Sequence, residues 1–133
     1  MNKLKTAAIV LGVLAGLIGA FHGLGEMLQG NIAPKETSFE AWPQLATLSG
    51  FPATTIIPSL LVAGILTIII GVFIAVWASK FFTRRTDGLF LIPLSVLLLM
   101  VGGGIVPPLF GIAGGLIATV NNYIIVKNGD DKS

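Results

Sequence analysis

Four long apolar stretches fill most of the chain and restrict the folds that it can adopt. The stretches cover residues 6–28, 55–79, 88–106 and 107–126. Only the first contains any Asp, Glu, Lys, Arg or His, namely His22 and Glu26. A helix needs roughly 20 residues to cross the ~30 Å hydrocarbon core of a bilayer, and each stretch is about that long. The sequence therefore predicts an all-α integral membrane protein, a four-transmembrane-helix bundle in one domain over residues 1–133.

The positions of the Lys and Arg residues predict how these helices are oriented. Of the eight in the chain, only Lys35 lies between the first and second stretches. The others precede the first stretch, join the second to the third, or follow the fourth; they are Lys3, Lys5, Lys80, Arg84, Arg85, Lys127 and Lys132. Because short cytoplasmic loops retain basic residues, we expect both termini in the cytoplasm of a prokaryotic cell and residues 29–54 outside.

Composition excludes several classes of protein. With 54% hydrophobic and 11% charged residues, the chain has too little polar surface for a soluble domain. The net charge of +2 comes from basic residues beside the spans, so we expect no nucleic-acid partner. The absence of cysteine excludes disulfides and thiolate chemistry. We find no catalytic constellation and expect no enzyme, and we expect Asp87, Asp130 and Asp131 in solvated segments.

A cleaved signal peptide is the alternative interpretation of the first stretch. Lys3 and Lys5 precede the apolar run, and Ala20 could mimic a cleavage site. Cleavage would leave three spans. The run is longer than the apolar region of a typical signal peptide and its polar residues come at the far end, so we interpret it as a membrane helix.

The long connection over residues 29–54 predicts a short external interfacial helix. Thr37 and Glu40 have the spacing of a capping box. Apolar residues then recur every three positions and could form one face; they are Phe39, Trp42, Leu45 and Leu48. At the other external connection, Gly102–Gly104 followed by Pro107 and Pro108 predict a tight hairpin, because proline is tolerated in the first turn of a helix.

Small residues recur at helical spacing in the first and fourth stretches. The first carries Gly12, Gly16, Gly19, Gly23, Glu26 and Gly30 at spacings of 4, 3, 4, 3 and 4. The fourth carries Gly111, Gly115, Ala118 and Asn122 at spacings of 4, 3 and 4. Such repeats keep residues on one helical stripe, and small residues let helices approach closely inside a bilayer. We predict that both stripes, which exclude Ala15, pack against other helices.

His22 and Glu26 are the candidate site. Their spacing of four residues places them on one face of the first helix, near its outer end, with Gln29 following. Ionisable residues within a membrane helix are expensive and usually bind something or pair with each other. Two interpretations stay open: a proton-binding or ligand-binding site, or a structural pair in which His22, Glu26 and Gln29 or Asn31 satisfy one another.

Two classes of function fit these features. The first is an oligomeric transport or ligand- and ion-binding unit with an outward-facing polar site at His22 and Glu26. In this unit Glu26 would exchange a proton for a cation or a polar substrate, and His22 would tune Glu26. The alternative is a non-enzymatic accessory, regulatory or immunity-type subunit that docks another membrane protein through its glycine-rich faces. One histidine and one carboxylate supply too few ligands for a closed zinc site, and a two-histidine haem would need a second chain, so we expect no metal or cofactor. The expected partners are the lipid bilayer and either further copies of the chain or a larger membrane protein.

Overall fold

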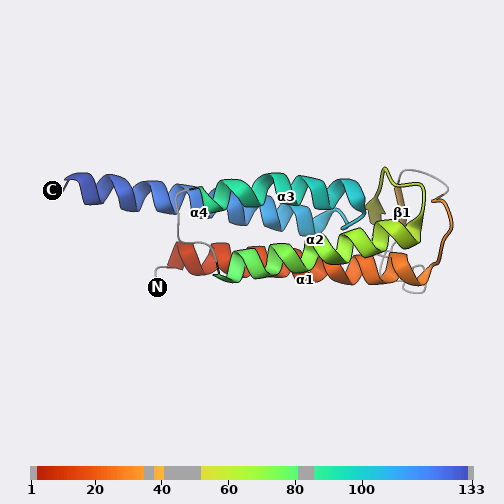
Figure 1. Cartoon of the computed structure of the whole chain (residues 1–133). Helices are drawn as coiled ribbons and strands as arrows, with labels where there is room; N and C mark the ends of the chain where they lie inside the picture. The colour runs from red at the N-terminus through yellow and green to blue at the C-terminus, as the bar shows by residue number, and fades with distance from the viewer. Residues whose placement is uncertain (1–2, 35–37, 41–51, 81–85, 132–133) are drawn as a thin grey trace.

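The computed structural model describes residues 3–34, 38–40, 52–80 and 86–131 (Figure 1). Its regular structure is helical apart from two short strands. The helices are α1 (Lys3–Leu28), α2 (Leu60–Lys80), α3 (Asp87–Val101) and α4 (Val106–Asp131). By length and composition, α1, α2 and most of α4 can each cross a membrane, whereas α3 is apolar but shorter, with 15 residues.

The two strands replace part of the predicted interfacial helix. β1 (Ser38–Glu40) and β2 (Pro52–Thr54) pair in antiparallel fashion, with Phe39 opposite Ala53. The prediction of a helix is therefore wrong at its start, because Phe39 and Glu40 are extended and their backbone pairs with β2. The rest of that predicted helix, including Trp42, lies outside the described residues.

Three helix boundaries differ from the predicted spans. α2 begins at Leu60 and not at residue 55, and the Leu60 N–H donates to the Ile32 carbonyl oxygen at 2.9 Å. α3 ends at Val101, five residues early, because Gly102 turns the chain with a φ of +121°. α4 begins at Val106 with two prolines in its first turn, where a missing N–H costs nothing, and continues to Asp131.

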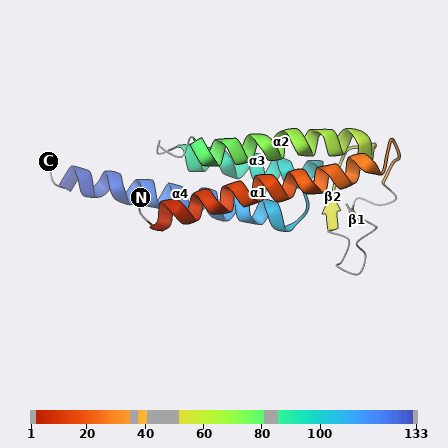
Figure 2. The ribbon, with the colours of Figure 1, turned by 90° about the horizontal axis from the view of Figure 1, so that it is seen from below.

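The four helices lie alongside one another in two antiparallel pairs. α1 packs along α2 and α3 packs along α4, while further contacts join α1 to α4 and α2 to α3 (Figures 1 and 2). The N-terminal end of α1 and the C-terminal end of α4 lie at the same end of the molecule, and β1 and β2 lie at the other. The last part of α4 projects beyond the other helices (Figure 1).

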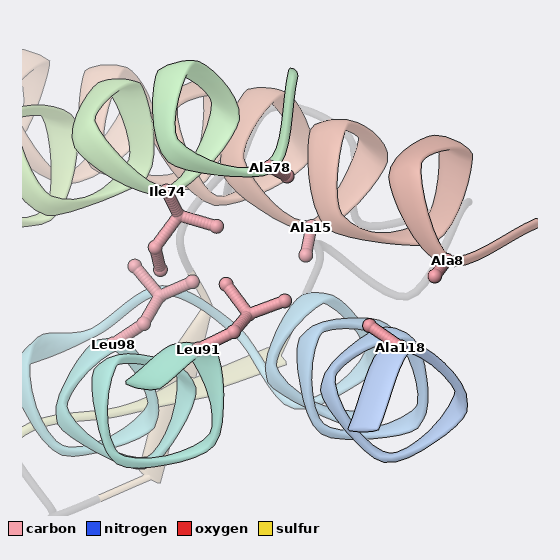
Figure 3. Close-up of a cluster of buried hydrophobic side chains, with 7 residues drawn as sticks. All are labelled: Ala8, Ala15, Ile74, Ala78, Leu91, Leu98 and Ala118. Carbon is pink, nitrogen blue, oxygen red and sulfur yellow. The ribbon is translucent and has the colours of Figure 1, made fainter. Parts of the chain in front are cut away.

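The core between the helices is built largely from alanine and leucine (Figure 3). Its buried members come from all four helices; they are Ala8, Ala15, Ile74, Ala78, Leu91, Leu98 and Ala118. Ala15 is fully buried although it lies off the glycine stripe, because α4 covers that flank of α1. A Cβ placed on Gly111 would lie 3.5 Å from the Ala15 Cβ. α1 therefore presents two packing faces, and the stripe is only one of them.

The glycine stripe of α1 contacts α2 through backbone atoms. Gly16 lies against the Gly71 carbonyl oxygen, and a Cβ on Gly71 would in turn lie 2.6 Å from the Gly16 carbonyl oxygen. Gly23 and Gly64 meet in the same reciprocal way, with separations of 2.7 and 2.5 Å. Neither helix has room for a methyl group at these four positions, since backbone cannot move aside as a flexible side chain can.

The remaining stripe residues have different surroundings. Gly12 faces Ala78 of α2, whereas Gly19 faces the Leu98 side chain of α3. Gly30 follows the end of α1 with a φ of +89°, and no atom lies within 4 Å of a Cβ placed there. It is therefore a turn residue and not a packing residue.

The stripe of α4 faces α3 over part of its length. Gly111 lies against the Ser95 side chain, and a Cβ on Gly115 would lie 2.6 Å from the Gly88 carbonyl oxygen. Asn122, further along, is only half-buried, whereas its neighbour Asn121 is buried. The close contact between α3 and α4 thus comes from the two glycines.

The end of the molecule that holds the chain termini buries one carboxyl unexpectedly. Asp87, the first residue of α3, is 6% exposed and not solvated as predicted. The Trp77 indole N–H of α2 donates to the Asp87 carbonyl oxygen at 3.2 Å, and the indole packs against the Phe90 ring at 4.6 Å. This position is favourable for Asp87, because a carboxyl in the first turn of a helix complements the helix dipole.

Candidate functional site

His22 and Glu26 lie on α1 near the end that faces the strands, and both are buried within the single chain. His22 is 4% exposed and Glu26 is 0% exposed. The connection between α3 and α4 covers them. Gly102 lies directly against the Glu26 carboxyl, where a Cβ would be 2.7 Å from Oε1, and Gly104 lies against the His22 ring, where a Cβ would be 2.6 Å from Nε2.

The connection Gly102–Gly104 therefore covers the two polar side chains, a role that the sequence did not predict. Gly102 and Gly104 both have positive φ, at +121° and +87°, which favours glycine. The absence of a side chain also makes room for the two polar groups of α1. The triple glycine predicted only a hairpin, and the one further signal is its position, since it comes at the same end of the helices as Glu26.

The imidazole and the carboxyl do not hydrogen-bond to each other. The Ile18 carbonyl oxygen accepts a hydrogen bond from His22 Nδ1 at 2.8 Å, which requires the tautomer with the proton on Nδ1 or the doubly protonated ring. Neither Glu26 oxygen has a hydrogen-bond partner within the described part of the chain. The interpretation in which the two side chains satisfy one another thus does not describe this structure.

Gln29 and Asn31 likewise leave the carboxyl unsatisfied. Gln29 follows α1, is half-buried, and donates its backbone N–H to the Glu26 carbonyl oxygen at 3.1 Å. Asn31 accepts a hydrogen bond from the Ser59 hydroxyl at 2.7 Å, which ties the end of α1 to the start of α2. Of the predicted site residues, His22 and Glu26 are the two that are buried against Gly102 and Gly104.

Two threonines bind the carbonyl group next to Gly102, and one of them, Thr67, neighbours Glu26. The Thr55 and Thr67 hydroxyls both donate to the Val101 carbonyl oxygen, at 3.1 and 3.2 Å. Val101 immediately precedes the Gly102 that contacts the carboxyl, and the Thr67 hydroxyl is the neighbouring side-chain group on α2. A hydroxyl has one hydrogen, so while Thr67 donates to Val101 it presents only lone pairs to Glu26.

The C-terminal end of α3 is fully capped around this site. The Leu98 carbonyl oxygen accepts from the Gly103 N–H at 2.8 Å, and the Met100 carbonyl oxygen accepts from the Ile56 N–H at 3.0 Å. The Thr54 hydroxyl donates to the Leu99 carbonyl oxygen at 3.1 Å. Helix ends leave four carbonyls without partners in the helix. Here the residues just before α2 supply most of the donors, which fixes the end of α3 beside Glu26.

Apart from His22, the described surroundings of Glu26 contain no side chain that could balance an ionised carboxylate. The Lys residues that the structure describes lie on the parts of α1, α2 and α4 at the opposite end of the molecule. The nearby C-terminal end of α3 carries partial negative charge. Within the described ranges, no three His, Asp or Glu side chains gather as a transition-metal site requires.

The outer surface offers hollows of a different kind. One on α2 is lined by apolar side chains alone; they are Ile68, Ile69, Val72, Phe73 and Val76. A second, between α1 and α4, is lined by Leu4, Leu116, Ile117 and Val120. Neither has the polar groups that would orient a polar substrate. They are suited to lipid chains.

Comparison of the chain with protein-family models, with curated proteins and with solved structures found no match.

Proposed function

We propose that the protein is a small polytopic membrane protein that binds a proton or a small cation at Glu26, as an oligomeric ion-binding or transport unit. In this proposal all four helices cross the membrane, both termini are cytoplasmic, and the site lies toward the outer surface of a prokaryotic cell membrane. The positive-inside distribution of Lys and Arg supports this orientation. Large exposed apolar side chains on the helices, such as Leu17 at 55% and Ile69 at 58%, support contact with lipid.

One observation carries the proposal: Glu26 is fully buried and both its oxygens lack a hydrogen-bond partner in the described part of the chain. Burying an ionised carboxylate without a partner costs several kcal/mol or more. The carboxyl must therefore hold a proton or recruit a cation. A purely structural glutamate would be expected to use its oxygens in hydrogen bonds, so we assign Glu26 a binding role and His22 the role of modulating it.

The alternative, an accessory subunit that docks through its glycine-rich faces, has less support. Gly16 and Gly23 already contact α2, and Gly111 and Gly115 already contact α3. A partner could reach these faces only if the helices of this chain separated. Further copies of the chain, or a larger membrane protein, would instead have to use the exposed apolar surfaces, and we propose a homo-oligomer of this kind.

Infrared difference spectroscopy of the purified protein between pH 5 and pH 9 tests the role of Glu26. We expect a carboxylic-acid C=O band that responds to pH and is absent from Glu26→Gln, since glutamine keeps the size of the side chain but cannot ionise. Asp87→Asn is the matched control, because Asp87 is also buried but lies at the other end, and the band should survive that change.

The same samples test assembly. Size-exclusion chromatography with light scattering in mild detergent should give one homo-oligomer for the parent and for Glu26→Gln. A Glu26→Gln protein with the parent's infrared spectrum and the parent's stability at every pH would refute the binding role. A monomer that co-purifies with a larger membrane protein would instead support the accessory function.

A further inference from the structure

Several oxygen atoms of the described residues lie around Glu26, and His22 is the one side chain among these residues that can carry a positive charge. The carboxyl lies against Gly102, at the C-terminal end of α3, where the helix dipole is negative. The Val101 carbonyl oxygen belongs to the residue before Gly102, and it accepts a hydrogen bond from the Thr67 hydroxyl, which neighbours the Glu26 carboxyl, at 3.2 Å. Val101 and Thr67 thus bring oxygen atoms with lone pairs to the neighbourhood of the carboxyl.

We propose that this cluster is a site for a small monovalent cation of the Na⁺ type, held by the Glu26 carboxylate and the Thr67 hydroxyl, with the Thr55 hydroxyl nearby. This inference rests on the proposed role of Glu26 and names the ligand class of that site. The threonine oxygens can share a lone pair with a cation and still donate their hydrogens to Val101, so binding keeps the capping of α3 intact.

The charge of the site selects a monovalent ion. Glu26 is the only carboxylate in the cluster, and His22 adds no charge in its neutral form, with the proton on Nδ1 that it donates to Ile18. One Na⁺ neutralises one carboxylate, whereas a divalent ion would leave a net charge buried in a medium of low dielectric constant. Oxygen ligands also match hard cations in preference to transition metals.

The space at the site selects a small ion. The Glu26 carboxyl lies directly against the Gly102 backbone, and a Cβ on Gly102 would already be 2.7 Å from Oε1 and closer still to Oε2. An organic cation does not fit in that contact. This contact leaves no room for a substituted ammonium ion, so the proposal is limited to a small inorganic cation such as Na⁺ or Li⁺.

Binding is an exchange with a proton. The protonated Glu26 carboxyl releases H⁺ to water as Na⁺ binds the carboxylate, so the net charge of the site does not change. His22 is the other titratable group that lies near the site. On α2, α3, the connection 102–105 and the start of α4, which pack against this end of α1, the described residues near Glu26 include no other Asp, Glu, Lys, Arg or His. The strands at this end of the molecule carry one further carboxyl residue, Glu40 of β1.

The test is the thermal unfolding of the full-length protein in mild detergent, with NaCl replaced by choline chloride at constant ionic strength. We expect a saturable rise in melting temperature with Na⁺ or Li⁺, and no rise with choline. Near and below neutral pH, each unit of pH decrease should raise the Na⁺ midpoint by about tenfold, because one proton competes. In weakly buffered solution, Na⁺ should release protons from the parent protein.

Matched variants locate the site. Thr67→Val keeps the shape of the side chain but removes the oxygen, and it should raise the Na⁺ midpoint by roughly tenfold or more, as expected for loss of a ligand. Thr119→Val is the control, because the Thr119 hydroxyl only donates to the Gly115 carbonyl oxygen within α4, at 2.7 Å. Glu26→Gln should fold, as judged by circular dichroism, and lose the Na⁺ response.

Two results would overturn the cation site: no difference between Na⁺ and choline for the parent, or equal Na⁺ midpoints for Thr67→Val and Thr119→Val. If either occurs while the infrared band of Glu26 still responds to pH, the proton-binding role survives and only the Na⁺ inference fails. If Glu26→Gln matches the parent in both the infrared and the Na⁺ experiments, the proposed function fails as well.

Discussion

At the scale of single residues, the contact of Gly102 and Gly104 with Glu26 and His22 is the feature that the sequence could least disclose. The spacing of His22 and Glu26 predicted one polar face, and both side chains do lie on it. What covers them depends on the course of the chain some 80 residues later. The pattern that marks a tight turn, three glycines in succession, is the same whether or not a polar group lies beneath it. A three-dimensional contact of this kind has no local sequence signal.

Gly104 and Gly30, two of the three described glycines with positive φ, give a prediction at this scale. Gly104→Ala should lower the stability of the protein more than Gly30→Ala, although both residues have a φ near +90°. Gly30→Ala meets no atom within 4 Å, so it costs only backbone strain, about 1 to 2 kcal/mol. Gly104→Ala adds a clash with the buried His22 ring, worth roughly 1 to 3 kcal/mol more. Melting temperatures measured in one detergent compare the two.

A second substitution separates the backbone strain at position 104 from the clash with the His22 ring. His22→Ala should relieve much of the extra cost of Gly104→Ala in a double-mutant cycle, because it removes the ring that the new methyl group meets. Equal losses of stability for Gly30→Ala and Gly104→Ala would mean that the connection is free to move away from His22.

At the scale of secondary structure, the sequence predicted the helices better than their ends. The apolar runs located all four helices, since a helix of this kind needs little beyond length and hydrophobicity. The sequence overestimated the length of α3, because residues 102–106 contain no charged residue and were counted in the apolar stretch, although Gly102–Gly104 had predicted a hairpin there. The helix ends at Val101 because hydrogen bonds from Thr54, Thr55 and Ile56, which are distant in sequence, cap it there.

The packing of α1 on α2 gives the prediction at this scale. Gly16→Ala should destabilise the protein more than Gly19→Ala, although both belong to the same glycine stripe. The new methyl group at Gly16 would meet the Gly71 and Ala75 backbones, which cannot move without separating the helices, whereas at Gly19 it would meet the Leu98 side chain. Overpacking of this kind costs roughly 1 to 3 kcal/mol, and the lower end should apply where a side chain can rotate away.

The melting temperatures of Gly16→Ala and Gly19→Ala, measured beside that of Gly129→Ala, test this prediction. Gly129 lies in α4 with no atom within 4 Å of a Cβ placed there, so its substitution should be neutral or slightly stabilising. Ala15, which the sequence placed off the stripe, cannot serve as the control because it is fully buried against α4. Identical behaviour of Gly16→Ala and Gly129→Ala would show that α1 and α2 do not pack as closely as described.

At the scale of the whole molecule, the fold separates the described lysines and the candidate site to opposite ends. The described lysines, Lys3, Lys5, Lys80 and Lys127, lie at the end that holds the chain termini, whereas Glu26 and the strands lie at the opposite end. The same asymmetry that would orient the helices in a membrane thus places the candidate cation site at the face remote from the lysines. A cation that reached Glu26 from that side would not have to pass any described lysine.

This arrangement yields a prediction for the protein in its native membrane. Single cysteines introduced at Ser38, in β1, and at Asn128, exposed near the end of α4, should react with a membrane-impermeant maleimide from opposite sides. Ser38→Cys should label in intact cells, and Asn128→Cys only after the membrane is permeabilised, because basic flanks are retained in the cytoplasm. The chain has no cysteine of its own, so the parent protein is an unlabelled control. Labelling of both positions from the same side would contradict the crossing of the membrane by all four helices. It would also change the side of the membrane from which a cation is expected to reach Glu26.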